Sequence, residues 1–135
     1  RILLKRFIIL CTRIAREKFS VSPEREKAFD MVRQFYVLVD NHFKEKKMVQ
    51  DYANMLHRSP KTLSNLFTTC GLPSPLRIIH ERIEAEAKRL LLYSQKSAKE
   101  ITEILGFEDQ ATFSRFFKKM TGESVSEYRK REKQE

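Results

Sequence analysis

Apolar residues recur at helical spacing in two segments of this chain, about fifty residues apart. The first segment contributes Leu63, Leu66, Phe67 and Cys70, and the second contributes Phe113, Phe116, Phe117 and Met120. Both sets follow the spacing i, i+3, i+4 and i+7, which places their side chains on one face of an α-helix. The chain is therefore predicted to contain two copies of one amphipathic helix.

The opposite faces of these two predicted helices carry hydroxyl, amide and basic side chains. The first helix presents Lys61, Thr62, Ser64 and Asn65, and the second presents Gln110, Thr112, Ser114, Arg115, Lys118 and Lys119. Side chains of these types donate hydrogen bonds to polar and anionic partners. The two outer faces are therefore the candidate binding surfaces.

A shorter predicted helix precedes each copy, so that each half of the duplication is a helix-turn-helix unit. The apolar positions of the shorter helix are Val49, Tyr52, Ala53 and Leu56 in the first unit, and Ala98, Ile101, Thr102 and Leu105 in the second. Ser59 and Asp109 are typical N-cap residues for the two longer helices, and Ser97 is one for the second shorter helix. Pro60 suits the first helical turn, and Gly106 suits a turn with positive φ.

Amphipathic patterns predict further helices on both sides of the first unit. A helix over residues 23–45 is expected to bury Phe29, Val32, Tyr36, Val39 and Phe43. A connecting helix over residues 75–93 is expected to bury Leu76, Ile79, Ile83, Ala87 and Leu90. Ser124 follows Gly122 as a helix start and repeats the start at Ser74. The duplication therefore extends beyond the paired helices.

Residues 2–19 are predicted to form a basic amphipathic helix. Its apolar positions repeat every seven residues and are Leu3, Phe7, Leu10 and Ile14. A stripe with this period is typical of helices that pack against another helix. We therefore expect this face to pack against a partner.

Composition supports an all-α fold and a polyanionic partner. The chain has 135 residues, of which 41% are hydrophobic and 33% charged, and it contains only three Gly and four Pro. These values are typical of a folded domain rich in helices with short connections. A net charge of +9 and a pI near 9.7 favour nucleic acid or an anionic membrane surface as partner.

The sequence carries no pattern typical of an enzyme, a cofactor site or a metal site. Cys11 and Cys70 form no CxxC pair, and His42 and His57 have no companion ligands nearby. His80 lies near two glutamates, which we interpret as a solvated helix face rather than a metal site. No stretch approaches the roughly 20 apolar residues that span a bilayer. We therefore expect a cytoplasmic protein without catalytic residues, cofactor, metal or membrane partner.

Two helix-turn-helix units favour double-stranded DNA as the partner. The major groove is about 12 Å wide and admits one α-helix when a second helix supports it. Gln110 can pair with adenine and Arg115 with guanine, each worth roughly 1–3 kcal/mol of discrimination. Lys118 and Lys119 lie farther along the helix and are better placed for phosphate groups.

Two other interpretations are compatible with the same pattern. Amphipathic helices with basic outer faces can be the solvated surface of a helical bundle. A basic helical module can also bind a protein or a membrane without recognising DNA, and residues 1–20 in particular fit that description. The duplication, the charge and the turn residues together favour DNA over both alternatives.

The segment over residues 99–129, KEITEILGFEDQATFSRFFKKMTGESVSEYR, resembles the second helix-turn-helix signature of the AraC/XylS family of bacterial transcription regulators. The segments SPKTLSNLF and IIHERIEAEAKRLLL resemble the first half of the same domain. The resemblance covers residues from about 30 to 130. It implies a homeodomain-like, seven-helix domain in which a long helix joins two helix-turn-helix subdomains.

The resemblance also implies which side chains contact DNA. The base-facing positions correspond to Lys61, Ser64, Asn65, Gln110, Ala111, Ser114 and Arg115. The positions expected at phosphate groups are Ser59, Thr62, Thr68, Thr112, Lys118 and Lys119. Three positions depart from the pattern of many members. Asn65 replaces an arginine, Val125 replaces a proline, and Thr102 replaces an alanine.

For the N-terminus, the resemblance implies the last helix of an effector-binding and dimerising domain of cupin type. Leu3, Phe7, Leu10 and Ile14 then form a dimer seam. The expected division is residues 1–20 for this helix, 21–73 for the first subdomain, 74–95 for the linker helix and 96–135 for the second subdomain. The resemblance further implies a transcription activator that contacts RNA polymerase, of which this chain is a C-terminal piece.

Overall fold

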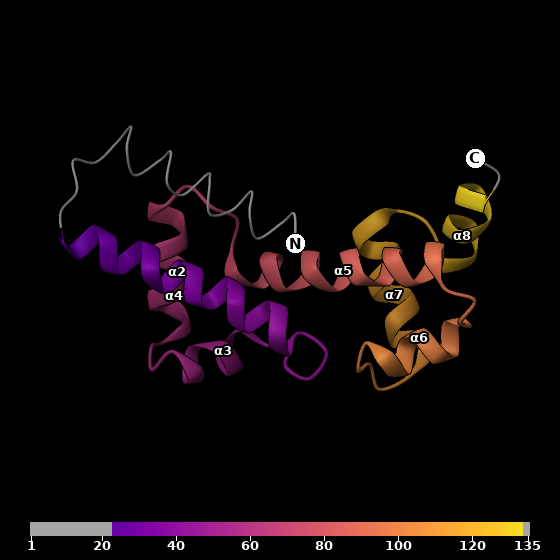
Figure 1. Cartoon of the computed structure of the whole chain (residues 1–135), viewed down its shortest axis with the longest axis horizontal. Helices are drawn as coiled ribbons and strands as arrows, with labels where there is room; N and C mark the ends of the chain where they lie inside the picture. Colours follow the sequence, from indigo (N-terminus) through magenta and orange to yellow (C-terminus); the bar gives the residue numbers. More distant parts are fainter. Residues whose placement is uncertain (1–22, 134–135) are drawn as a thin grey trace. The chain divides into compact units, whose positions relative to one another are not determined.

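Helix caps and left-handed turns divide residues 23–133, the part of the chain that this computed structural model describes, into successive α-helices (Figure 1). The helices are α2 (Pro23–His42), α3 (Val49–Met55), α4 (Pro60–Thr69), α5 (Pro75–Tyr93), α6 (Ala98–Ile104), α7 (Gln110–Thr121) and α8 (Val125–Lys133). Residues 23–133 contain no strand, and the predicted all-α fold is confirmed. None of these helices is long and apolar enough to cross a membrane. The predicted helix over residues 2–19, with Leu3, Phe7, Leu10 and Ile14, lies outside the described residues.

The described residues form two compact units. The first contains the described residues up to His42 together with Lys46–Ile79, and the second contains Phe43–Glu45 and the described residues from His80 onward. The first unit thus holds α2, α3, α4 and the start of α5, and the second holds the rest of α5 with α6, α7 and α8. Each unit therefore contains one helix-turn-helix pair.

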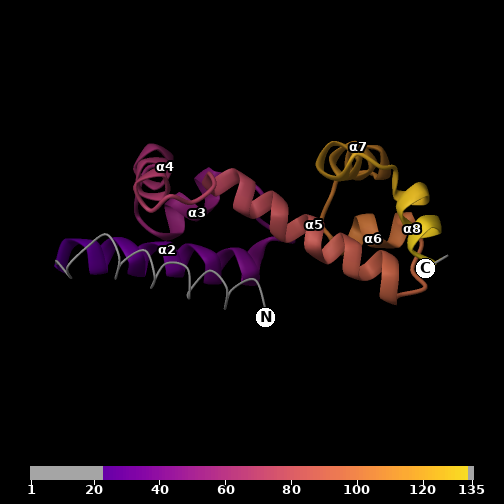
Figure 2. The same ribbon diagram turned by 90° about the horizontal axis from the view of Figure 1, so that it is seen from above.

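An aromatic cluster joins the helices of the first unit. The ring centroid of Phe35 in α2 lies 5.0 Å from that of Phe67 in α4 and 5.5 Å from that of Tyr52 in α3. All three side chains are fully buried. Aromatic pairs at such distances contribute about 0.5–1.5 kcal/mol each beyond the burial of their surface. The cluster therefore holds α4 against α2 and α3, an arrangement visible in both views (Figures 1 and 2).

The buried face of α2 differs from the predicted one. Val32, Phe35 and Val39 are buried, whereas Tyr36 and Phe29 are only half-buried. The prediction omitted Phe35, which is fully buried, and in this it is wrong. Tyr36 lies at the edge of the core, where its ring stacks on that of Phe67 in α4 at a centroid distance of 6.4 Å. Adjacent helix residues point about 100° apart, and α3 and α4 contact α2 on the side of Phe35. The helix also ends at His42, three residues before the predicted end.

The buried positions of α5 also depart from a single stripe. Ile79, Ile83, Ala87 and Leu90 are buried as predicted, but Leu76 is 43% exposed. Ile78 and Leu91 are buried instead. Because α5 supplies core residues to two units, its buried positions do not follow one face along its whole length.

The core of the second unit is built around α7. Phe113 and Phe117 of this helix are fully buried. The ring centroid of Phe117 lies 5.5 Å from that of Tyr128 in α8, and the ring centroid of Phe113 lies 5.4 Å from that of Phe107 in the preceding turn. Complete burial of one such side chain stabilises the fold by about 1.5–3 kcal/mol. The inner face of α7 is therefore fixed by α8 and by its own turn.

The two helix-turn-helix turns share one backbone geometry. The left-handed residue is His57 in the first turn, with φ 57°, and Gly106 in the second, with φ 79°. In each turn the next N–H donates to a carbonyl oxygen of the shorter helix. These hydrogen bonds join Arg58 N to Ala53 O at 2.9 Å and Phe107 N to Thr102 O at 3.1 Å. The predicted positive φ of Gly106 is confirmed.

Candidate nucleic-acid interface

The longer helix of the first unit, α4, exposes one polar face. Its N-cap is Ser59, as predicted, and the Ser59 hydroxyl oxygen accepts a hydrogen bond from the Thr62 backbone N–H at 3.1 Å. Pro60 occupies the first turn, and Leu63 and Phe67 are fully buried. The predicted base-facing residues of this helix, all exposed, are Lys61, Ser64 and Asn65. The buried residues of α4 thus orient these three side chains toward solvent.

The longer helix of the second unit, α7, has the same arrangement. Asp109 is its N-cap, as predicted, and its carboxylate accepts a hydrogen bond from the Thr112 N–H at 2.7 Å. Phe113 and Phe117 form the buried face. The predicted base-facing residues are Gln110, Ala111 and Arg115, which are exposed, and Ser114, which is half-buried.

Polar side chains at the start of α7 are connected by hydrogen bonds. The Thr112 hydroxyl lies 2.8 Å from Asp109 Oδ1, and Arg115 Nη2 lies 3.4 Å from Thr112 Oγ1. The pKa of Asp109 lies below its usual value, mainly because the backbone N–H and hydroxyl of Thr112 donate to it; the charge of Arg115 adds to the effect. Asp109 is exposed and ionised at neutral pH, and these hydrogen bonds favour its charged form further.

The residues predicted at phosphate groups occupy exposed or half-exposed positions. Thr62 shares a hydroxyl contact of 2.9 Å with Ser59, and the Thr68 hydroxyl donates to the Ser64 carbonyl oxygen at 2.9 Å. Lys118 and Lys119 are exposed in the last turn of α7. Both α4 and α7 therefore carry hydroxyl groups near their starts, and α7 carries cations at its end.

The imidazole of His80 is packed against α7 rather than solvated. Its ring centroid lies 5.2 Å from that of Phe116 in an edge-to-face arrangement, and the side chain is half-buried. Burial lowers the pKa of His80, and the charge of Lys119 lowers it further. The predicted solvated face applies to Glu81, which is exposed, but not to His80, because the Phe116 side chain of α7 packs against its ring.

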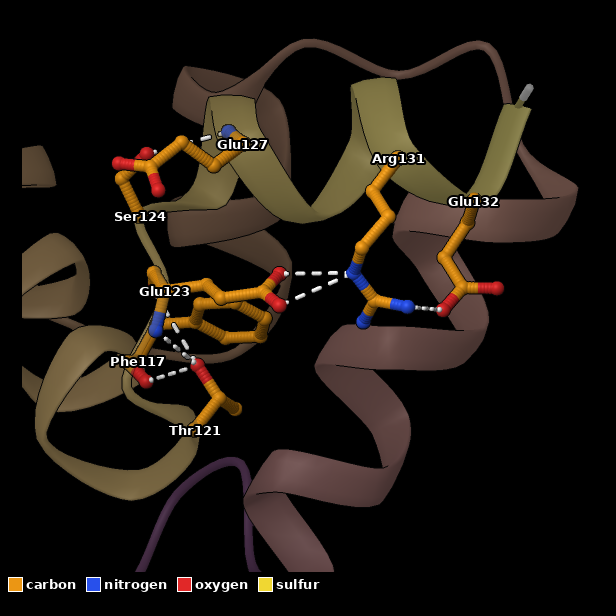
Figure 3. A network of polar contacts seen from close by, with 7 residues as sticks. All are labelled: Phe117, Thr121, Glu123, Ser124, Glu127, Arg131 and Glu132. Carbon is orange, nitrogen blue, oxygen red and sulfur yellow. Dashed lines mark hydrogen bonds and ion pairs between the residues drawn. The ribbon is translucent and has the colours of Figure 1, made fainter. Parts of the chain in front are cut away.

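The junction between α7 and α8 is held by the polar side chains of Thr121, Glu123 and Arg131, which sequence reasoning did not select (Figure 3). The Thr121 hydroxyl donates to the Phe117 carbonyl oxygen at 2.8 Å and lies 3.2 Å from the Glu123 backbone N–H, which donates to it. The Glu123 carboxylate accepts a hydrogen bond from Arg131 Nε at 2.9 Å. These contacts fix the C-terminal end of α7. They have no sequence signal beyond the hydroxyl and charged residue types near the end of that helix.

Other reactive groups form no site in the described residues. Residues 23–133 contain no cluster of three or more His, Cys, Asp or Glu side chains that could hold a metal ion. Cys70 is a buried free thiol, and burial raises its pKa. The thiol is therefore protonated at neutral pH and packs as a small apolar group.

Comparisons with known proteins agree with this geometry. The sequence model of a family described as "Helix-turn-helix domain" matches residues 52–131. The uncharacterized HTH-type transcriptional regulator YisR of Bacillus subtilis is 30% identical over 122 residues, which are 90% of this chain and 41% of that protein. The arabinose operon regulatory protein of Salmonella typhimurium is 36% identical over 92 residues, which are 68% of this chain and 31% of that protein. The chain spans less than half the length of the curated relatives it matches.

Solved structures share the fold. The C-terminal domain of AraT, a response regulator from Geobacillus stearothermophilus, has a TM-score of 0.67 at 29% identity, with 74% of this chain and 84% of that chain covered. The DNA-binding domain of AdpA, solved in complex with a target DNA, has a TM-score of 0.61 at 24% identity, with 71% and 86% covered. The chain belongs to the AraC/XylS family of transcription regulators and contains the helix-turn-helix DNA-binding domain of that family.

Proposed function

We propose that this chain binds double-stranded DNA sequence-specifically and places α4 and α7 in successive major grooves. The family is one of DNA-binding transcription regulators and not of enzymes. The observation that carries the proposal is the shared polarity of the two helices, since each buries two side chains completely and exposes a polar face. Successive major grooves on one side of B-DNA lie about 34 Å apart, which sets the expected spacing of the two half-sites.

The base-facing residues are proposed to be the exposed ones near the start of each helix. They are Lys61, Ser64 and Asn65 in α4, and Gln110, Ala111, Ser114 and Arg115 in α7. The Arg115 guanidinium can donate two hydrogen bonds to guanine, and the Gln110 amide can pair with adenine. The first helix has no arginine, so we expect weaker base discrimination in its half-site.

A second group of residues is proposed to contact phosphate groups. It comprises Ser59, Thr62, Thr68, Thr112, Lys118 and Lys119. Such contacts fix the position of the protein on the duplex but carry little sequence information directly. They are therefore expected to strengthen binding to every sequence.

Selection from a random duplex pool tests the proposal. We expect a bipartite site with half-sites one helical turn apart. Arg115→Ala is expected to lose roughly 1–3 kcal/mol of discrimination at one base pair. Lys130→Ala, an exposed change in α8, serves as the control. Unchanged base preference in Arg115→Ala would show that α7 does not recognise bases in this way.

The wider activity is proposed for the whole protein. We propose that the whole protein is a bacterial cytoplasmic activator that contacts RNA polymerase and dimerises through residues 1–20. We also propose that a linker helix over residues 74–95 joins a first subdomain over residues 21–73 to a second over residues 96–135. A relative named transcriptional activator NphR, 32% identical over 101 residues, supports the activating role. Sedimentation of the chain with and without residues 1–20 tests the dimer, and equal masses would rule out a seam at Leu3, Phe7, Leu10 and Ile14.

A further inference from the structure

A directed chain of hydrogen bonds links the N-cap of α7 to its exposed arginine. A hydroxyl group has a single proton, and the Thr112 hydroxyl donates it to Asp109 Oδ1 at 2.8 Å. The Thr112 oxygen is then left as an acceptor, and Arg115 Nη2 lies 3.4 Å from it. The three residues are spaced at i, i+3 and i+6, so that Thr112 bridges two groups of opposite charge.

The first unit has the cap without this connection. Ser59 and Thr62 make the corresponding hydroxyl contact at 2.9 Å, but Ser59 is neutral. Asn65 occupies the position equivalent to Arg115, and within the described residues its side chain makes no hydrogen bond to Thr62. The charged connection is therefore present in α7 and absent from α4, although the two helices share their scaffold.

We propose that Thr112 is a positioning residue for base recognition, because its hydroxyl, oriented by Asp109, holds the Arg115 guanidinium in place before DNA binds. This inference rests on the proposed base-facing role of Arg115. An arginine side chain has many rotamers, and ordering it on binding costs affinity. A guanidinium that is already ordered recognises guanine with a smaller loss of conformational freedom, and a displaced one contacts other bases more readily. Thr112 thus affects selectivity through Arg115, in addition to any phosphate contact.

Thr112→Val tests the inference, since it removes the hydroxyl and keeps the shape of the side chain. The probes are the duplex selected from a random pool and its variants at the base pair where Arg115→Ala relaxes preference. We expect discrimination at that base pair to fall about three- to tenfold, a part of the full effect of a bidentate contact. Thr112→Ser retains the hydroxyl and is expected to restore discrimination. Thr62→Val is the matched change in α4. Because Thr62 is proposed to contact a phosphate group, this variant is expected to weaken binding to every duplex alike without changing discrimination at that base pair.

Asp109→Asn provides a second, independent variant. Asparagine caps helices as well as aspartate does, so the melting temperature is expected to stay close to that of the unmodified chain. Loss of the charge is nevertheless expected to reduce discrimination at the same base pair. Melting curves of all variants separate this effect from a change in folding.

Three outcomes distinguish the inference from its alternatives. If Thr112→Val weakened binding to every duplex by the same factor, Thr112 would act as a phosphate contact, and the positioning role would be overturned. Relaxed preference in Arg115→Ala together with unchanged preference in Thr112→Val would overturn the positioning role and leave the proposed function intact. Unchanged preference in Arg115→Ala would overturn both.

Discussion

The Arg129 guanidinium in α8 donates a hydrogen bond from Nε to the backbone carbonyl oxygen of Leu91 at 3.0 Å. Leu91 lies in the last turn of α5, where carbonyl groups have no partner within the helix. A cationic donor is favourable at this end of a helix because the helix dipole places partial negative charge there. The contact therefore joins the end of α5 to the last described helix.

Arg129→Met is expected to destabilise the fold by about 1–3 kcal/mol, because it leaves a carbonyl group at the end of α5 without its charged donor. The measurement is urea denaturation followed by circular dichroism. Lys130→Ala, at the next and exposed position, is the control and is expected to change stability by less than about 0.5 kcal/mol. Equal stability of the two variants would show that the Arg129 contact contributes little.

The duplicated helices could be predicted from the sequence because their signals are local. The apolar spacing around Phe67 and Phe117 and the caps at Ser59 and Asp109 depend only on nearby residues. The hydrogen bond from Arg129 could not be predicted, since it joins residues 38 positions apart.

The choice between adjacent apolar residues also depends on distant parts of the chain. Phe35 and Tyr36 are both aromatic, and only the approach of α3 and α4 decides which of them is buried. At the candidate interface, the cap at Asp109 could be predicted from residue type. The connection from Thr112 to Arg115 could not, because it depends on the rotamer of a long exposed side chain.

A buried carboxylate in α5 offers a second test of stability. Glu86 is 8% exposed, accepts two hydrogen bonds from Arg89 and lies 3.9 Å from the Lys44 ammonium group. Glu86→Ala is expected to cost about 1–3 kcal/mol, because the partner cations lose their anion. Glu84→Ala removes an ion pair with Lys88 whose carboxylate is more exposed than that of Glu86, and it is expected to cost about 0.3–0.5 kcal/mol. Similar losses in the two variants would contradict the role assigned to burial.

Glu86 is also expected to make the stability of the fold fall at acidic pH. Its pKa is lowered mainly by the hydrogen bond from Arg89, with help from nearby positive charges. The folded state therefore holds this proton less tightly than the unfolded state does. The stabilisation is present above the ordinary glutamate pKa, about 4.3, and is lost as the pH falls through the lowered value. Denaturation curves below pH 5 are expected to show a weaker pH dependence in Glu86→Gln than in the unmodified chain.

His80 predicts a pH dependence in a different range. Burial and the charge of Lys119 lower its pKa, so the folded state binds this proton less tightly than the unfolded state. The stability of the fold is therefore expected to be highest above the ordinary histidine pKa, about 6.5, and to decrease as the pH falls below that value. His80→Gln is expected to flatten this part of the stability profile.

Lys119→Gln tests the electrostatic part of the same prediction. The substitution removes one cause of the lowered pKa of His80. The folded-state pKa is then closer to the unfolded-state pKa, so stability is expected to change with pH over a narrower interval. Lys118→Gln, also exposed in the last turn of α7, is the matched control. Melting temperatures measured at constant ionic strength provide the comparison. An identical profile in Lys119→Gln and Lys118→Gln would exclude an influence of Lys119 on His80.

Substitutions at the left-handed residues of the two helix-turn-helix turns are expected to change stability in different directions. His57 adopts φ 57° where the second turn has Gly106 at φ 79°. A residue with a Cβ atom loses about 1–2 kcal/mol in this conformation, whereas glycine does not. His57→Gly is therefore expected to leave stability unchanged or to raise it by up to about 1 kcal/mol, after the entropy cost of glycine. Gly106→Ala is expected to lower stability by about 1–2 kcal/mol. Denaturation that found Gly106→Ala as stable as the unmodified chain would contradict the shared geometry.

Substitution of a lysine in α7 is expected to affect DNA binding differently from substitution of Arg115. Lys118 is exposed in the last turn, beyond the proposed base-facing residues. If it neutralises one phosphate group, Lys118→Ala weakens binding to all duplexes alike and lowers the slope of log affinity against log salt by about one. Titrations at several salt concentrations, with the selected duplex and an unrelated one, measure both quantities. Lys130→Ala in α8 is the control for loss of one charge, and an equal change of slope in that variant would mean that Lys118 acts only through net charge.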